Sequence, residues 1–376
     1  MSTNATREGT QQAVARLSTL DRFLPLWILG AMALGLLLGR FVPGIGPALD
    51  TLKIANVSLP IALGLLVMMY PVLAKVRYSQ TGAVLQDKKL MVTSLVLNWV
   101  AAPAFMFALA WIFLPDLPEY RTGLIIVGLA RCIAMVLIWN DLACGDREAA
   151  AVLVAINSVF QVFAFGALGW FYLQLLPSWL GLETTSAGFS FWAITGSVLI
   201  FLGIPLVAGY LSRTLGERAK GRDWYEGSFL PKIGPFALYG LLFTITVLFA
   251  MQGGTVTDRP LDVVRIALPL LVYFLVVFGA GMLLGRILKL GYARTATLAF
   301  TAAGNNFELA IAVAIGTFGV TSGQALAGVV GPLIEVPVLV ALVYAALWAR
   351  RFFTADAFPP QNGTFTLDTT TAKAKP

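Results

Sequence analysis

The stretch GLIIVGLARCIAMVLIWNDLACGD, residues 123–146, is almost entirely apolar, yet an arginine and a cysteine stand side by side near its middle, at Arg131 and Cys132. A helix needs about 20 apolar residues to cross a bilayer, and this stretch is long enough. Arg131 lies nine residues from both Thr122 and Asn140, so its charge would sit at mid-membrane. A charge at that depth costs at least about 2.5–3.5 kcal/mol unless it is paired or hydrated. Arg131 therefore marks a structural or functional contact.

The composition is that of an integral membrane protein. Hydrophobic residues make up 58% of the 376 residues, charged residues make up 12%, and the mean hydropathy is +0.82. A soluble domain carries about twice that share of charge. We predict an all-α fold of ten transmembrane helices, over 23–42, 54–74, 90–114, 122–142, 149–176, 189–211, 232–251, 265–285, 295–318 and 323–348.

Few residues lie outside this membrane domain, which covers 23–348. The first 22 residues lack an apolar core, so they are not a signal peptide, and we predict a cytoplasmic N-terminal segment over 1–22. The tail 349–376 is rich in Thr, Ala and Pro, a composition typical of disorder. The longest predicted loop, 212–231, is too short for a water-soluble domain.

The net charge of +7 reflects membrane topology rather than binding to nucleic acid. With a cytoplasmic N-terminus, 20 of the 26 Lys and Arg residues fall on the inner side and 5 on the outer side, with Arg131 inside a span. Such a bias predicts that both termini are cytoplasmic. We therefore expect a multi-pass protein of the cell membrane whose surroundings are lipid.

The two halves of the chain resemble each other at an offset near 176 residues. PIALGLL (60–66) recurs as PFALYGLL (235–242), with one residue added. We predict two repeats of five spans, over about 23–176 and 189–348. Because five is odd, the second repeat must be inverted in the membrane. Inverted repeats build many secondary transporters, whose binding site lies at the repeat interface.

The ninth predicted span carries Gly304, Asn305 and Asn306 at its middle, and these are poor helix formers. At an offset of 176, Cys132 in the fourth span falls opposite Glu308 in the ninth. Interrupted helices at matching positions of two halves point to a substrate site. We predict that the fourth and ninth helices are discontinuous and that their inner ends meet at mid-membrane, with backbone dipoles directed into one cavity.

Three ionisable side chains lie inside the predicted spans, Arg131, Glu308 and Glu335. Arg131 and a glutamate could form a structural ion pair that locks the halves together, or could act in transport. The nearby break favours a functional role for Glu308, whereas both roles stay open for Glu335. Cys132 could be a small apolar filler, but at a helix break it would lie at a helix N-terminus, where thiols are reactive. Cys144 has no such context and is more simply incidental.

Enzyme classes find no support in the residues. The chain has no histidine, which excludes His-containing triads, and it shows no metal-ligand spacing and no phosphate-binding loop. We predict no enzymatic activity and no cofactor. Energy for transport must come from an ion gradient or a separate subunit. Without histidine, any proton carrier must be a carboxylate or another titratable group.

The segments GLARCIAMVLIWND (128–141), AAGNNFELAIAVAIGTFG (302–319) and GPLIEVPVLV (331–340) resemble the Acr3 family of arsenite efflux permeases. The resemblance covers residues 20–350. That family is similar to bile acid:sodium symporters, with ten spans in two inverted repeats and crossed, discontinuous fourth and ninth helices. The resemblance implies export of As(III), and variably Sb(III), in exchange for protons. It says nothing of protein partners from an arsenic operon.

The same resemblance implies an essential thiol at Cys132 and an essential carboxylate at Glu308. For proton coupling we name Glu308, with Glu335 as the next candidate. A soft As(III) centre prefers a thiolate ligand, and the amides of Asn305 and Asn306 can bind its hydroxyl groups. Two rival classes remain. One is a sodium-coupled organic-anion symporter of the same fold; the other is a passive metalloid channel or the membrane subunit of an ATP-driven pump.

Overall fold

The computed structural model describes residues 23–42, 44–49, 51, 53–54, 57–76, 87–133, 135–184, 190–258 and 260–353. The predicted N-terminal segment 1–22 and the predicted disordered tail beyond Phe353 lie outside the described residues. The described chain is almost entirely helical, as the apolar runs predict. Its one sheet is a two-stranded antiparallel pairing of β1 (Lys53–Ile54) with β2 (Val57–Ser58).

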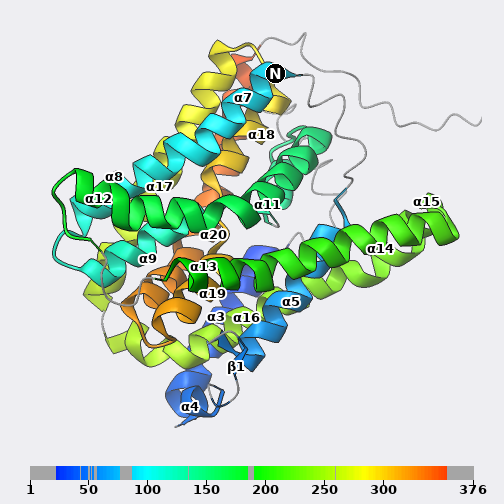
Figure 1. Ribbon diagram of the computed structural model, residues 1–376. Helices are drawn as coiled ribbons and strands as arrows, with labels where there is room; N and C mark the ends of the chain where they lie inside the picture. The colour runs from blue at the N-terminus through cyan, green and yellow to red at the C-terminus, as the bar shows by residue number, and fades with distance from the viewer. Residues whose placement is uncertain are drawn as a thin grey trace, which may run out of the picture.

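One group of helices comes from two distant parts of the chain. Helix α16 packs along both α3 and α5, and α14 packs along α5; Figure 1 shows these helices side by side in the lower half of the molecule. A short helix α4 (Ile45–Leu49) follows α3. The members of the group are α3 (Leu24–Phe41), α5 (Leu59–Ala74), α13 (Phe191–Val198), η3 (Leu199–Gly203), α14 (Ile204–Lys220), α15 (Arg222–Trp224), η4 (Tyr225–Phe229) and α16 (Leu230–Asp258).

The remaining helices form a second group, most of which lies in the upper half of Figure 1, while α19 lies lower, near α13. Helix α17 packs on α18 and α20, and α9 packs on α8 and α20. The members are α7 (Lys88–Val96), η1 (Leu97–Ala101), α8 (Ala102–Phe113), α9 (Pro118–Leu129), α10 (Met135–Leu142), α11 (Arg147–Trp170), η2 (Phe171–Leu175), α12 (Leu176–Trp179), α17 (Pro260–Ile287), α18 (Tyr292–Ala303), α19 (Phe307–Phe318), α20 (Gly323–Ala349) and η5 (Arg350–Phe352). Helix α13 joins the groups, because it packs on α11 and α19.

Local sequence explains where several of these helices begin. The side chains of Asp87, Asp146, Ser190 and Ser322 each accept a hydrogen bond from the backbone amide three residues later. Such caps satisfy amide groups that have no partner inside the helix. The polar residues that interrupt the apolar runs thus fix the helix starts.

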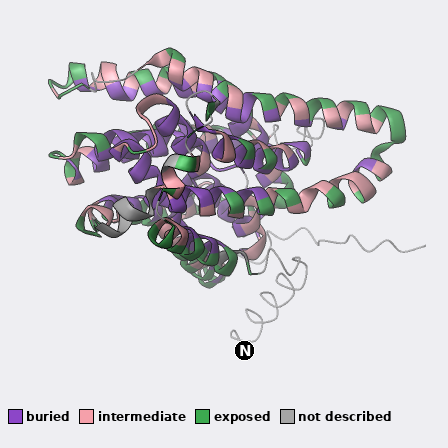
Figure 2. Cartoon of the chain, turned by 90° about the horizontal axis from the view of Figure 1, so that it is seen from below, coloured by how far each residue is buried: buried purple, intermediate pink, exposed green. Residues whose placement is uncertain are grey.

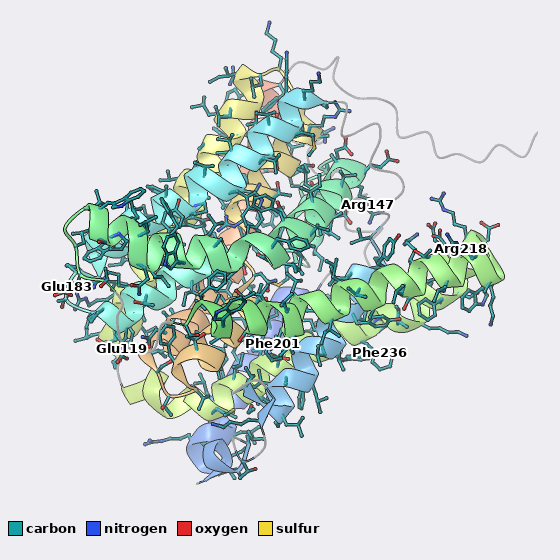
Figure 3. The ribbon with its side chains drawn as sticks, viewed as in Figure 1. Glu119, Arg147, Glu183, Phe201, Arg218 and Phe236 are labelled. Carbon is teal, nitrogen blue, oxygen red and sulfur yellow. The ribbon has the colours of Figure 1, made fainter. Side chains whose placement is uncertain are left out.

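Six helical segments within the described residues are long and apolar enough to cross a membrane. Large apolar side chains are exposed along them, as in Val92, Phe163, Trp192, Leu261 and Leu283. Figure 2 shows buried residues concentrated in the centre of the molecule and exposed residues on its outer faces. An apolar exterior of this extent is typical of a protein surrounded by lipid. In Figure 3, Glu119 and Glu183 lie at one end of the molecule, and Arg147 and Arg218 lie at the other.

The structure corrects two predicted boundaries. The segment 212–231 is not a loop, because α14 continues to Lys220 and α15 begins at Arg222. Gly221 makes the tight turn between them with a φ of 84°, a left-handed conformation that glycine adopts without steric cost. The second predicted span, 54–74, becomes helical only from Leu59, because the short β pairing precedes it.

Candidate functional site

The fourth and ninth predicted helices are both broken, and the two breaks cross. Helix α9 ends at Leu129 and α18 at Ala303, and Ala130 and Gly304 are extended. The amide of Cys132 donates to the carbonyl of Gly304 at 3.2 Å. The amide of Asn306 donates to the carbonyl of Ala130 at 3.0 Å. Each break therefore satisfies backbone groups of the other, which a membrane interior requires.

This crossing is an antiparallel pairing of Arg131 with Asn305. In its register, Ala130 lies opposite Asn306 and Cys132 lies opposite Gly304. The alignment at an offset of 176 placed Cys132 opposite Glu308, but the residue that faces Cys132 across the crossing is Gly304. Two apolar sequences can be aligned at several offsets, whereas the backbone hydrogen bonds of the crossing define a single register.

Arg131 is fully buried and ties the ends of two half-helices together. Its Nη1 donates to the hydroxyl of Tyr273 at 2.8 Å and to the carbonyl of Ala302 at 3.2 Å, and its Nη2 donates to the carbonyl of Gly128. Gly128 and Ala302 belong to the last turns of α9 and α18, where carbonyl groups lack helical partners. A cation is favourable there, because the C-terminal end of a helix carries partial negative charge.

An ion pair between Arg131 and a glutamate, one of the two alternatives that the sequence left open, is absent from the described part of the chain. Arg131 forms no ion pair there within 4.0 Å. The helix ends and Tyr273 supply the compensation instead. Arg131 is therefore a structural element of the crossing, and the two membrane glutamates are not neutralised by a direct contact with it.

Cys132 lies inside the crossing rather than at the start of a helix, because α10 begins only at Met135. Its side chain is 3% exposed. Opposite it stands Gly304, whose lack of a side chain leaves the room that the Cys132 side chain occupies. Cys144 belongs to a different place, the turn that follows α10, with a φ of 55°. Within the described residues, neither cysteine forms a disulfide.

Asn305, Asn306 and Glu335 surround the same crossing and are all buried. The amide of Asn305 donates to Oε1 of Glu335 at 3.3 Å, and Oδ1 of Asn305 accepts from the hydroxyl of Tyr273 at 3.4 Å. Oδ1 of Asn306 caps α19 by accepting from the amide of Leu309 at 3.0 Å. The structure thus brings Cys132, both asparagines and Glu335 into one cluster.

Glu308 differs from the other members because it is partly exposed. It lies in the first turn of α19, where the partial positive charge of the helix N-terminus favours a carboxylate. It is also close enough to Glu335 for the two charges to interact. Glu308 is therefore less deeply buried as a residue than Glu335, and it lies two residues after Asn306 of the cluster.

Two residues of the cluster are absent from the sequence-based prediction, Gln161 and Tyr273. Oε1 of Gln161, on α11, accepts a hydrogen bond from the amide of Arg131, and the hydroxyl of Tyr273, on α17, accepts one from the Arg131 guanidinium. A glutamine in an apolar helix was a signal that could have drawn attention to position 161. Tyr273 carried none, because tyrosine is common in membrane helices.

Several buried polar atoms around the crossing have no hydrogen-bond partner within the described residues. They are Nε of Arg131, Nε2 of Gln161, Nδ2 of Asn305, Nδ2 of Asn306 and Oε2 of Glu335. Buried polar groups normally have partners, and unsatisfied ones call for an explanation such as a ligand or water. Four donors and one acceptor beside a thiol can bind a small molecule that carries hydroxyl groups.

Comparisons of the sequence with known proteins show the family of the chain. The model of the sodium bile acid symporter family matches residues 62–259. The chain is 62% identical to the arsenical-resistance protein Acr3 of Corynebacterium glutamicum, over 96% of this chain and 97% of that protein. It is 32% identical to Acr3 of Alkaliphilus metalliredigens, over 89% and 94% of the two chains.

A further relative is an uncharacterized transporter of Synechocystis, which is 37% identical over 92% of this chain and 93% of that protein. The matches to the three relatives cover 89–96% of this chain and so include both breaks, whereas the family-model match ends at residue 259, before α18. The chain therefore belongs to the Acr3 family of arsenical-resistance proteins, within the sodium bile acid symporter family of transporters.

Proposed function

We propose that this protein exports arsenite from the cytoplasm in exchange for protons, with Cys132 as the ligand of As(III). The observation that carries the proposal is the crossing itself, where the buried Cys132 thiol lies among buried polar atoms that lack partners within the described residues. The names of the two Acr3 relatives support arsenic as the substrate. The same site accounts for variable export of Sb(III), which is also a soft centre.

Binding at Cys132 requires no cofactor and no redox change. Arsenous acid reacts with the thiol to form an As–S bond, and the thiol proton leaves with one hydroxyl group as water. The remaining hydroxyl groups bind to Asn305 and Asn306. Release reverses the step, and one thiol gives a labile bond suited to a carrier.

Glu308 carries the exchanged proton, because it is a partly exposed acidic residue in the first turn of α19, directly after the crossing. Glu335 is the alternative carrier, since it is buried in the cluster and within electrostatic range of Glu308. Entry of one proton for each neutral substrate that leaves moves one positive charge inward. Such a cycle draws about 2.3 kcal/mol from each 100 mV of membrane potential.

The transport domain covers 23–348 and consists of two inverted repeats of five spans, with α9–α10 and α18–α19 as the fourth and ninth. Both termini are cytoplasmic. The symmetric pairing of the two breaks supports the repeats, and the excess of Lys and Arg on one side supports the orientation.

Transport into everted membrane vesicles tests the proposal. An acid interior should drive arsenite accumulation, and an ionophore that collapses the pH gradient should abolish it. Accumulation that requires sodium would select the organic-anion symporter of the same superfamily. Accumulation that requires ATP would select a pump subunit, and mere equilibration would select a channel.

A further inference from the structure

The two arms of the crossing are held in the same way by side chains from two different helices. On one arm, the amide of Arg131 donates to Oε1 of Gln161 on α11. On the other arm, the amide of Asn305 donates to Oε1 of Glu335 on α20. Each acceptor lies 30 residues after its donor in the sequence. Gln161 is therefore the counterpart of Glu335 in the other half of the chain.

The orientation of the Gln161 carboxamide follows from its partner. The amide of Arg131 can only donate, so the atom that faces it must be the oxygen of the side chain and not its nitrogen. Nε2 of the same planar group then lies beside that hydrogen bond, one residue from Cys132. Gln161 is fully buried, and its Nε2 has no partner within the part of the chain that the structure describes.

The free atoms on the two arms have opposite character. Gln161 presents a donor, Nε2, and Glu335 presents an acceptor, Oε2, which is also without a partner among the described residues. The hydroxyl groups of a thiol-bound As(III) both donate and accept hydrogen bonds. A donor on one arm and an acceptor on the other match such a ligand better than two carboxylates would.

We propose that Gln161 is a positioning and substrate-binding residue: its Oε1 holds the Arg131 amide, and with it Cys132, while its Nε2 donates to a hydroxyl group of the bound As(III). The inference rests on the proposed arsenite site. It adds Gln161 to that site as the residue that holds one arm of the crossing, as Glu335 holds the other.

The test uses the full-length protein with Cys144→Ser, so that Cys132 is the one remaining thiol. The rate of Cys132 alkylation by N-ethylmaleimide reports the position of the thiol without any transport. The concentration of sodium arsenite that halves this rate reports binding. Gln161→Glu keeps the Oε1 acceptor and removes the donor, whereas Gln161→Leu removes both. Gln324→Leu makes the same change at another buried glutamine, in the first turn of α20.

For Gln161→Glu we expect alkylation within about twofold of the parent and a half-protecting arsenite concentration about tenfold higher, which is about 1.4 kcal/mol. For Gln161→Leu we expect faster alkylation as well, because the Cys132 segment loses its anchor. Gln324→Leu should match the parent in both measurements. The double variant Gln161→Glu/Glu335→Gln, which moves the donor to the other arm, should recover part of the lost protection.

The possible failures are distinguishable. If arsenite does not protect Cys132 in the parent, the thiol site itself is refuted, and this inference with it. If arsenite protects the parent and Gln161→Glu at the same concentration, the donor role alone is refuted. If Gln161→Leu is too unstable to purify, the isosteric Gln161→Glu variant still decides the binding role.

Discussion

The backbone amide of Cys132 is hydrogen-bonded to the carbonyl of Gly304 at 3.2 Å, so the predicted substrate ligand is fixed by a residue of the other half of the chain. The reciprocal bond runs from the amide of Asn306 to the carbonyl of Ala130 at 3.0 Å. Neither bond involves a side chain. The position of the thiol therefore depends on the backbone of the ninth predicted span as much as on its own.

A methyl group at position 304 should displace the Cys132 thiol, although Gly304 itself carries no side chain that could bind the substrate. A Cβ there would lie 3.0 Å from Cβ of Cys132 and 3.3 Å from the carbonyl oxygen of Phe300. Because the carbonyl is backbone, the cysteine must move. We expect Gly304→Ala to lower arsenite resistance at least tenfold at matched membrane abundance. Gly279→Ala on α17, with no atom within 4 Å of the added methyl, should retain it; equal resistance in both variants would contradict the account.

We expect serine substitutions at the two cysteines to have different effects on arsenite resistance. Cys132→Ser should abolish arsenite resistance because serine is a poor ligand for a soft As(III) centre. Cys144→Ser should leave resistance largely intact because Cys144 lies in the turn after α10 and not in the crossing. Growth on arsenite, with the abundance of each variant measured, checks both expectations. Resistance that persists in Cys132→Ser would rule out the thiol ligand.

Arg131 should matter for stability as well as for transport. Its guanidinium joins Gly128, Ala302 and Tyr273, and a lysine cannot reproduce that planar fork of donors. Hydrogen bonds that involve a charged group contribute about 1.5–3 kcal/mol each. We expect Arg131→Lys to lower the thermal unfolding temperature in detergent by several degrees. Arg218→Lys, at the exposed end of α14, should not, and equal unfolding temperatures for the two variants would argue against the capping role.

Sequence reasoning predicted the breaks because Gly304, Asn305 and Asn306 are poor helix formers placed inside an apolar run. The same residues drew attention to Glu308, which follows them closely. The adjacent polar residues Arg131 and Cys132 predicted the break in the fourth span. Polarity in an apolar context was the signal in each case, and the structure confirms that both helices are interrupted.

The parts that were missed depend on contacts between distant residues. The capping of α9 and α18 by Arg131 required knowing that two helix ends meet at one side chain. The similar roles of Gln161 and Glu335, each of which accepts a hydrogen bond from a backbone amide of the crossing, became visible only in the structure. The length of α14 was underestimated because its last turns are polar, although the Arg213–Glu217 pair at 2.5 Å supports them as helix.

The orientation of the chain can be tested by labelling. In a background without Cys132 and Cys144, Thr184→Cys should react with a membrane-impermeant thiol reagent in intact cells. Ala219→Cys, near the end of α14, should react only after the membrane is opened. Both positions are exposed, so a difference reports sidedness. Labelling of Ala219→Cys in sealed cells would overturn the cytoplasmic placement of the termini.

The most direct test of the central claim is arsenite flux through Glu308→Gln in everted vesicles, with the pH gradient and the membrane potential imposed separately. The substitution mimics a permanently protonated carboxylate, so the variant should bind arsenite and exchange it across the membrane, yet accumulate it at least tenfold more slowly than the parent. Glu308→Asp should keep part of the rate. If Glu308→Gln accumulates arsenite against the arsenite gradient at a near-native rate, the account is contradicted and Glu335 becomes the proton carrier.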